Sequence, residues 1–316
     1  MKHFLSIADL SSTEIWNILE WAKELKEELR SGYNEPLLKG KVMGMIFQKP
    51  SLRTRVSFDM AMLQLGGHAL YISPNEISLG ERESVPDVAR VLSGYVDVIM
   101  ARVFSHQHIL ELAEYSRVPV VNGLSDFNHP CQGITDIFTM WEKKGELKGL
   151  NMTYLGDANN VAVSLLFAAA KLGVNYTIGH PPGYGLPENA LQMGLEFAKE
   201  SGSQVTITED PVEAIKGADV VYTDTWTSMG QEAEAARREK IFPPFQVNSK
   251  LLSYAERNAI VMHCLPAHRG QEITDEVADG PQSVLFDQAE NRMHAQKGIL
   301  ATLLHDPGMM ATEEGL

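Results

Sequence analysis

The chain has 316 residues, of which 44% are hydrophobic and 22% charged, and its formal net charge is −14 at pH 7. That length suits about two average domains, and the composition is typical of a globular protein with a large apolar core. A surface that binds nucleic acid needs an excess of basic residues, so the acidic balance argues against nucleic acid as a partner.

The cysteine count and the N-terminal sequence bear on the compartment. The two cysteines, Cys131 and Cys264, are too few for a disulfide framework and indicate a reducing compartment. The N-terminal stretch lacks the apolar core of a signal peptide, and no run approaches the roughly 18 apolar residues of a membrane span. We therefore expect a cytoplasmic protein without a membrane segment.

The first expected element is a helix that begins with a capping box at Ser11 and Glu14 and ends at Gly32. Beyond it, strand-like and helix-like patterns alternate. The expected strands span residues 42–47, 69–72, 96–101, 118–122, 152–155, 176–179, 205–208, 220–223 and 260–263. The expected helices span residues 58–65, 85–92, 109–115, 133–144, 161–172, 188–201, 212–216 and about 286–304.

This alternation predicts α/β architecture, with mainly parallel sheets flanked by helices on both faces. A charged, polar stretch with two glycines, residues 141–152, follows four expected strands and precedes five more. We therefore expect two doubly wound domains, 1–146 and 147–285, with a C-terminal helix at about 286–316 packing back on the first. Ligands of such sheets bind at the carboxyl ends of the strands.

Hydroxyl and guanidinium groups gather just after the first expected strand, from Ser51 to Arg55. This stretch begins a helix, whose free N–H groups and dipole favour an anion. Arg53 and Arg55 carry planar forks that fit phosphate oxygens. Two cations in a first helical turn oppose the dipole unless an anion compensates. An ordinary Ser N-cap with solvated arginines is the alternative interpretation.

Polar side chains also follow the next strands of the first half. Arg102 ends a strand that is otherwise apolar, while His129 and Gln132 flank Pro130 at the start of a helix. Proline suits the first turn of a helix, and an imidazole and a carboxamide there can direct donors at a carbonyl oxygen or an amide. An exposed arginine, a capping histidine and a surface glutamine would give the same pattern.

The second half repeats this arrangement with different chemistry. Asn159 and Asn160 begin a helix after the fifth expected strand, either as caps or as amide donors to a carboxylate. Asp224 follows a buried strand, with Ser228 and Met229 just beyond it. An acid at that position can hold an ammonium group.

His263 and Cys264 end the last expected strand, and Arg292 lies early in the final helix. A buried cysteine is usually inert, but a thiol beside a histidine at the carboxyl edge of a sheet is a stronger site candidate. No Cys/His spacing matches a metal site, and no G-x-S-x-G elbow is present. The dinucleotide fingerprint G-x-G-x-x-G is also missing, which argues against an oxidoreductase of similar topology.

Four of these motifs occur in the order and spacing of the ornithine carbamoyltransferases, which the chain resembles over essentially its whole length. The motifs are Ser51-x-Arg53-Thr54-Arg55, His129-Pro130-x-Gln132, Asp224-x-x-x-Ser228-Met229-Gly230 and His263-Cys264-Leu265-Pro266. The first two are shared with aspartate carbamoyltransferases, and the last two resemble the ornithine enzymes. The resemblance implies an active site in the cleft between two domains, a homotrimer or multiple of trimers, no cofactor and no metal.

The resemblance also implies the reaction and the residue roles. A carbamoyl group would pass from carbamoyl phosphate to the δ-amine of L-ornithine, giving citrulline and phosphate in arginine metabolism, without a covalent intermediate. The implied catalytic residues are Arg102, His129, Asp224 and Cys264. The implied carbamoyl phosphate-binding residues are Ser51, Leu52, Arg53, Thr54, Arg55, Ser78, Arg102, His129, Gln132, Cys264, Leu265 and Arg292. The implied ornithine-binding residues are Asn160, Asp224, Ser228 and Met229.

Two positions depart from the family's pattern. Leu52 stands where many relatives have threonine, and Ser78 stands where many have glutamine. The alternatives that stay open are a different acceptor, putrescine or an N-acylated ornithine, and a non-catalytic protein that binds carbamoyl phosphate. Putrescine has no carboxylate for Asn160 to hold, and an acylated ornithine lacks the charged α-amine that suits Asp224.

Overall fold

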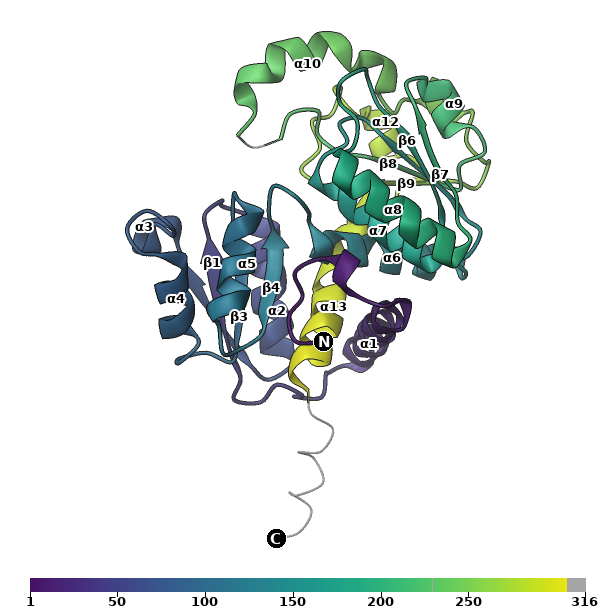
Figure 1. The fold of residues 1–316 in the computed structure, drawn as a ribbon. Helices are drawn as coiled ribbons and strands as arrows, with labels where there is room; N and C mark the ends of the chain where they lie inside the picture. Colours follow the sequence, from purple (N-terminus) through teal and green to yellow (C-terminus); the bar gives the residue numbers. More distant parts are fainter. Residues whose placement is uncertain (229, 306–316) are drawn as a thin grey trace. The chain divides into compact units, whose positions relative to one another are not determined.

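The computed structural model describes residues 1–228 and 230–305. The chain divides into two compact units, Met1–Asp126 with Arg292–Leu316, and Phe127–Asn291. Each unit is built on one parallel sheet flanked by helices (Figure 1). The predicted α/β class with two such sheets is therefore confirmed.

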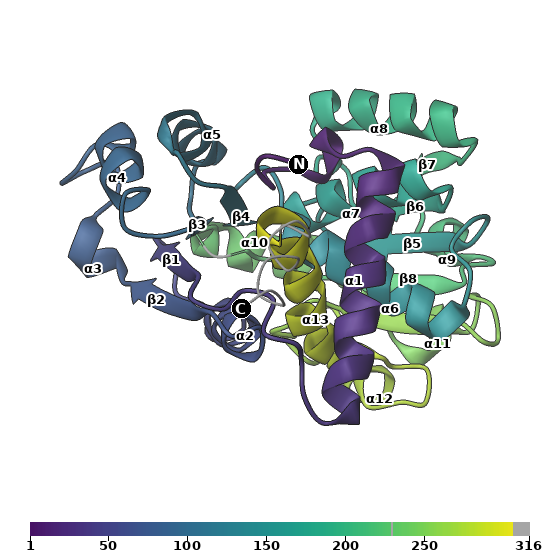
Figure 2. The same cartoon turned by 90° about the horizontal axis from the view of Figure 1, so that it is seen from below.

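The first unit holds a four-stranded parallel sheet in the order β2-β1-β3-β4. Its strands are β1 (Val42–Phe47), β2 (His68–Ile72), β3 (Val98–Arg102) and β4 (Val120–Leu124). Its helices are η1 (Ile7–Asp9), α1 (Ser12–Ser31), α2 (Leu52–Gln64), α3 (Pro74–Ile77), α4 (Val85–Leu92), α5 (His106–Tyr115) and most of α13 (Leu285–Leu304). Figures 1 and 2 show α4 and α5 on one face of this sheet and α2 on the other.

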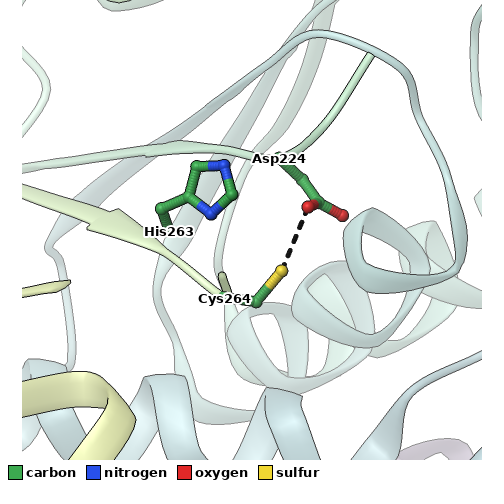
Figure 3. A group of neighbouring side chains, drawn as sticks. All are labelled: Asp224, His263 and Cys264. Atoms are coloured by element: carbon green, nitrogen blue, oxygen red, sulfur yellow. Dashed lines mark hydrogen bonds between the residues drawn. The ribbon is translucent and has the colours of Figure 1, made fainter. Parts of the chain in front are cut away.

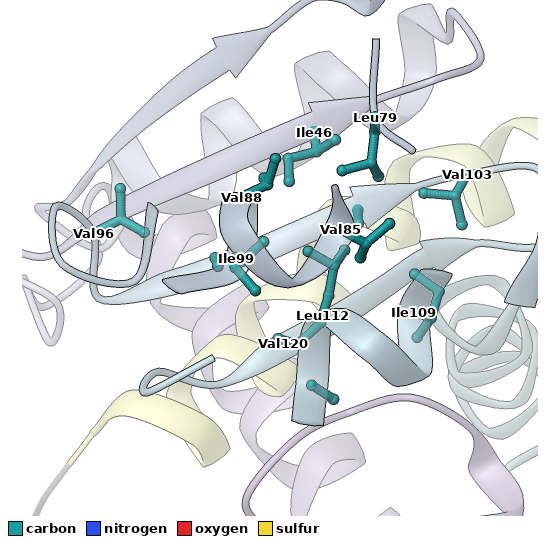
Figure 4. Close-up of a cluster of buried hydrophobic side chains, with 13 residues drawn as sticks. Ile46, Leu79, Val85, Val88, Val96, Ile99, Val103, Ile109, Leu112 and Val120 are labelled. Carbon is teal, nitrogen blue, oxygen red and sulfur yellow. The ribbon is translucent and has the colours of Figure 1, made fainter. Parts of the chain in front are cut away.

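An aliphatic core fills the space between the sheet of the first unit and helices α4 and α5 (Figure 4). Ile46 and Ile99 from the strands meet Val88 of α4 and Leu112 of α5, and all four are almost completely buried. Full burial of one such side chain contributes roughly 1.5–3 kcal/mol. This core fixes β1 and β3 side by side, which positions the residues that follow those strands.

Helices α1 and α13 lie side by side in the first unit (Figures 1 and 2). The predicted capping box of Ser11 and Glu14 starts α1, and Gly32 ends it at φ 126°. A Cβ atom at Gly298 of α13 would lie only 2.3 Å from the Ile18 carbonyl oxygen. A glycine at that position therefore lets the two helix backbones approach closely.

The second unit holds a five-stranded parallel sheet in the order β7-β6-β5-β8-β9. Its strands are β5 (Asn151–Leu155), β6 (Asn175–Gly179), β7 (Val205–Thr208), β8 (Val220–Thr223) and β9 (Ile260–His263). On one face lie α6 (Pro130–Lys144), α7 (Asn160–Leu172) and α8 (Glu188–Ser201). The remaining helices are α9 (Pro211–Ile215), η2 (Glu232–Glu234), α10 (Ala235–Ile241), η3 (Pro243–Phe245), α11 (Ser249–Leu252) and α12 (Asp275–Ala278).

Both sheets grow outward from a central first strand. The chain runs from β1 to β2 on one side and then to β3 on the other, so the connections diverge between β1 and β3. The same reversal occurs between β5 and β8 in the second sheet. Ligands of open parallel sheets bind at such switch points, beyond the carboxyl ends of the strands.

All nine predicted strands are confirmed, with each boundary within two residues of the structure. The short helices α3, α10, α11 and α12 are absent from the predictions, because one or two turns give too little periodicity. Contacts group residues 127–146, including α6, with the second sheet, whereas the sequence places them at the end of the first domain. The predicted domain boundaries stay a prediction.

The last predicted helix is confirmed as α13, and its residues from Arg292 onward pack within the first unit. Residues 306–316 of the predicted terminal segment lie outside the described residues. None of the described helices is both long enough and apolar enough to cross a membrane.

Lys297 of α13 is fully buried and donates a hydrogen bond to Asn34. Burial lowers the pKa of its ammonium group from 10.5 to about 8, although the charge of Glu28 opposes this. Between those two values the unfolded chain keeps a proton that the folded chain releases. The free energy of unfolding should therefore rise with pH across this range.

We predict that Lys297→Met removes this rise. The difference in unfolding free energy between wild type and variant, measured by urea denaturation, should shift in favour of the wild type as the pH increases from 8 to 10.5. The exposed Lys199, changed to Met, is the matched control and should show no such trend. A constant difference between wild type and Lys297→Met would contradict the prediction.

Candidate active site

A cluster of arginines surrounds the buried hydroxyl of Thr54 in the first unit. Ser51 is the N-cap of α2, as predicted, and its Oγ accepts from the Thr54 N–H at 3.3 Å. The Thr54 hydroxyl oxygen then accepts from Arg292 Nη2 at 2.6 Å and from Arg102 Nη1 at 3.5 Å. Arg102 ends β3, so residues beyond both strands of the first switch point meet here with the final helix.

Arg53 and Arg55 add two further cations in the first turn of α2. No acidic residue occupies that turn, and neither arginine forms an ion pair with a carboxylate in the described residues. The Arg55 guanidinium instead lies 4.1 Å from the ring centroid of Tyr71, a cation–π contact that holds its stem in place. The helix N-terminus and its arginines therefore form a positively charged surface of the kind that favours an anion.

The two residues that depart from the family's pattern, Leu52 and Ser78, lie at the start of α2 and at the end of α3. Leu52 is the first residue of α2 and is 75% exposed, and its apolar side chain offers no hydrogen-bonding group in place of a threonine hydroxyl. Ser78 adopts a left-handed conformation at φ 42°, at the C-cap of α3. In the described chain no hydrogen bond joins Ser78 to the arginine cluster.

An acid and a thiol form the core of the second group of candidate residues. Asp224 follows β8, Cys264 follows β9, and the Cys264 thiol donates to Asp224 Oδ1 at 3.1 Å (Figure 3). The other carboxylate oxygen, Oδ2, accepts from Asn159 Nδ2 at 2.7 Å. Asn159 Oδ1 also caps α7, so this one side chain connects the start of the helix to Asp224.

His263 adjoins this pair. Asp224, His263 and Cys264 each have one atom able to bind a metal ion, and these three atoms lie within 4.8 Å of one another. The backbone N–H of Leu265 donates to His263 Nδ1 at 2.8 Å, which leaves the ring proton on Nε2. Nε2 then donates to the buried Glu272 at 3.0 Å. Both ring nitrogens are engaged, so a metal ion would have to displace one of these hydrogen bonds.

The start of α6 carries the predicted pair His129 and Gln132. His129 occupies the N-cap position, as predicted, but its side chain makes no capping hydrogen bond, which argues against the alternative interpretation of a capping histidine. Its backbone N–H donates to the Ser164 hydroxyl at 2.8 Å instead. Gln132 Nε2 donates to the fully buried Asp136 at 2.7 Å.

These contacts close into a ring, which we call the hydrogen-bond circuit. It runs from Gln132 to Asp136, from Asp136 to Gln288 Nε2 at 2.7 Å, and from Gln288 Oε1 to the backbone N–H of His263 at 2.9 Å. From His263 the chain leads to Cys264, and hydrogen bonds continue through Asp224 to Asn159. The Asn160 carbonyl accepts from Ser164, which in turn accepts from His129, one turn before Gln132.

The remaining predicted residues of this group follow members of the circuit along the chain. Asn160 is the first residue of α7, directly after Asn159. Ser228 follows the β8 end, and its carbonyl accepts from the Gln231 N–H at 3.0 Å. Leu265 has φ 57°, a conformation that non-glycine residues adopt at a cost of about 1–3 kcal/mol and that concentrates at functional sites. Met229 lies outside the described residues.

One buried ion pair that sequence reasoning missed anchors the segment after Ser228. Arg238 of α10 donates to Asp157 Oδ2 and to the Trp226 carbonyl, both at 2.6 Å. Burial raises the pKa of the Asp157 carboxyl, and the hydrogen bond and charge of Arg238 reverse part of that rise. Arg238 therefore ties α10 to the loop that carries Asn159.

Comparisons with known proteins agree with this arrangement. The family models described as aspartate/ornithine carbamoyltransferase, carbamoyl-P binding domain, and Asp/Orn binding domain match residues 2–142 and 148–303. Ornithine carbamoyltransferase of Pyrococcus abyssi is 54% identical over 303 residues, or 96% of each chain. The anabolic ornithine carbamoyltransferase of Pyrococcus furiosus is 53% identical over the same length and coverage.

Solved structures show the same relationship. The structure of ornithine carbamoyltransferase from Pyrococcus furiosus matches with a TM-score of 0.94 at 53% identity, covering 96% of this chain and 97% of that one. Both domain families, the curated relatives and this structure agree with the resemblance predicted from the four motifs. The chain belongs to the aspartate/ornithine carbamoyltransferase family.

Proposed function

We propose that this protein is an ornithine carbamoyltransferase, which transfers the carbamoyl group of carbamoyl phosphate to the δ-amine of L-ornithine. The observation that carries the proposal is the presence of two complementary groups of side chains, each at the switch point of its own sheet. The first unit supplies the arginine cluster around Thr54, and the second supplies the Asp224–Cys264 pair. Transfer requires both groups to act on one pair of bound substrates.

The phosphate of carbamoyl phosphate suits the first group. Ser51, Arg53 and Arg55 surround the N-terminus of α2, where backbone N–H groups and guanidinium forks favour a dianion. The exposed Leu52 takes part through its backbone only. Ser78 stays a predicted carbamoyl phosphate-binding residue, and within the described residues no hydrogen bond joins it to the arginine cluster.

The carbamoyl carbonyl needs donors that stabilise the negative charge developing on its oxygen. Arg102, His129 and Thr54 are the residues to which we assign this role. Loss of one such donor typically lowers the rate by about 10²–10³. Gln132 would hold the carbamoyl amino group, and Arg292 joins the site through Thr54.

Ornithine suits the second group. Asp224 is a carboxylate for the α-ammonium group, and Asn160 with the residues from Ser228 to Met229 would hold the α-carboxylate. Cys264 and Leu265 would lie beside the δ-amine. That amine resembles the lysine side chain, with an ordinary pKa near 10.4, and it must lose a proton before it can attack.

In the reaction, the δ-nitrogen forms a bond to the carbamoyl carbon, and the bond from that carbon to the phosphate oxygen breaks. The two electrons of the broken bond leave with phosphate. The ammonium group loses one proton to solvent before the attack, and the nitrogen loses a second proton once its new bond has formed, which balances the charge of the departing phosphate as HPO4²⁻. A covalent enzyme intermediate is unnecessary, because holding both substrates in position supplies an effective molarity that can reach roughly 10⁵ M or more.

Three broader expectations belong to the same proposal. The synthetic direction, toward citrulline and arginine, follows the anabolic name of the Pyrococcus furiosus relative. Assembly as a trimer or multiple of trimers and a cytoplasmic location follow from the family resemblance and stay predictions.

An acceptor assay tests the proposed reaction. Purified protein with carbamoyl phosphate should form citrulline from L-ornithine, and it should form little product from putrescine or N-acetylornithine, because neither offers both the α-carboxylate and the α-ammonium group. Mass spectrometry of the products shows which of the three acceptors has been carbamoylated. Preferential use of another acceptor would contradict the ornithine assignment, and no product with any acceptor would indicate a non-catalytic protein.

A second prediction concerns Asn159, which the sequence left open between a cap and an amide donor. Asn159→Asp keeps the oxygen that caps α7 but replaces the donor to Asp224 with a second carboxylate. Loss of a hydrogen bond to a charged group is worth about 1.5–3 kcal/mol. We therefore expect kcat/KM for ornithine to fall by about 10- to 150-fold, with the KM for carbamoyl phosphate little changed.

The matched control is Asn175→Asp on β6, where the same substitution lies in an exposed pair with Asn151. This control should keep the steady-state parameters of the wild type. If Asn159→Asp retained the wild-type kcat/KM for ornithine, Asn159 would have no role in orienting Asp224.

A further inference from the structure

Asp136 lies in the second turn of α6, and its side chain is completely buried. Its Oδ1 is 2.7 Å from Gln132 Nε2 and 2.7 Å from Gln288 Nε2. An ionised carboxylate accepts hydrogen bonds but cannot donate them. Both glutamines therefore turn their amino groups, and not their carbonyl oxygens, toward Asp136.

This contact determines which end of the Gln132 amide faces the other way. A carboxamide has one NH2 group and one acceptor oxygen, so an NH2 group directed at Asp136 sends the Gln132 Oε1 to the opposite side. The helix fixes the geometry further, because Gln132 and Asp136 are four residues apart and face the same side of α6. The start of α6 thus presents an acceptor at Gln132, close to His129 in the same turn.

The second glutamine holds Asp136 from the other side. Gln288 Oε1 accepts from the backbone N–H of His263 at 2.9 Å, so its amide orientation is fixed independently of Asp136. Its Nε2 also lies 3.2 Å from the Tyr222 hydroxyl. Burial and the charge of Asp136 raise the pKa of Tyr222 well above its usual value, so this hydroxyl stays protonated.

We propose that Asp136 is a positioning residue that fixes Gln132 as an acceptor for the carbamoyl amino group, and so makes the site select a carbamoyl donor over an acyl donor of the same shape. The inference rests on the proposed function. A carbamoyl group and an acetyl group differ only by NH2 against CH3. The NH2 group donates to Gln132 Oε1, whereas a methyl group has no proton to donate to that oxygen, and such a mismatch lowers affinity by about 5- to 150-fold.

Two stable phosphonates that differ only in this group provide the probes: phosphonoacetamide, which carries NH2, and 2-oxopropylphosphonate, which carries CH3. Their dissociation constants, and that of inorganic phosphate, are measured by calorimetry on the wild type and on Asp136→Asn. The wild type should prefer phosphonoacetamide by about 5- to 150-fold. The amide that this substitution introduces can accept or donate, so Gln132 is free to turn, and the preference should fall to a few-fold.

The affinity for inorganic phosphate should be the same in both proteins, because the arginine cluster is untouched. Should Asp136→Asn fail to fold, Asp136→Ser is the second variant, since its hydroxyl fits the space of the carboxylate and donates as well as accepts. Gln288→Leu is the matched control. It removes the other amide from the same oxygen and should keep the preference, because Asp136 still accepts from Gln132.

A folded Asp136 variant with the full wild-type preference would overturn the inference. So would a Gln288→Leu protein that loses the preference to the same extent, because the effect would then reflect general disturbance of the buried polar group. Failure of the proposed function looks different, since the wild type itself would then bind neither phosphonate more tightly than phosphate.

Discussion

The hydrogen-bond circuit of the second unit is the constraint on which the rest of the proposed chemistry depends. Its members come from several elements: α6 carries Gln132 and Asp136, β9 leads to Cys264, and β8 leads to Asp224. The circuit closes through hydrogen bonds of 2.7–3.1 Å together with links along the chain, and turning the amide of Gln132 or Gln288 would break a hydrogen bond to Asp136. A buried polar network specifies one arrangement of side chains when its polar groups are fully hydrogen-bonded. A fixed arrangement suits the proposed site, which must hold two substrates in position.

The candidate residues of the first unit are mostly positively charged, unlike the hydrogen-bond circuit of the second unit. In a chain with a net charge of −14, arginines converge on the Thr54 hydroxyl and on the N-terminus of α2. Positive charge at a helix N-terminus is unfavourable without an anion, so a bound anion would stabilise this arrangement. Phosphate is the anion that we propose here, because it would both relieve the repulsion and fit the arginine forks.

The sequence predicted the strands well because each buried strand of a parallel sheet is a short apolar run bounded by polar residues. It also predicted the strand-end residues, since parallel strands bring their carboxyl ends to one edge. It did not predict the role of Asp136, because an acid inside an apolar helix gives no sign that the amide of Gln288 meets it from 152 residues further on. Asn159 was ambiguous for a related reason, since one amide both caps a helix and donates to an acid that is 65 residues distant. Arg238 was missed because its partner, Asp157, lies 81 residues away.

The central claim is that the arginine cluster and the Asp224–Cys264 pair act on one pair of substrates. The most direct measurement is the affinity of a ligand that joins the two halves covalently, with a phosphonoacetyl group on the δ-nitrogen of L-ornithine. If both groups of residues hold this ligand together, joining the halves should strengthen binding by about 10²–10⁴ over the better half alone. Calorimetry that finds the joined ligand no tighter than phosphonoacetamide or ornithine alone would contradict the account.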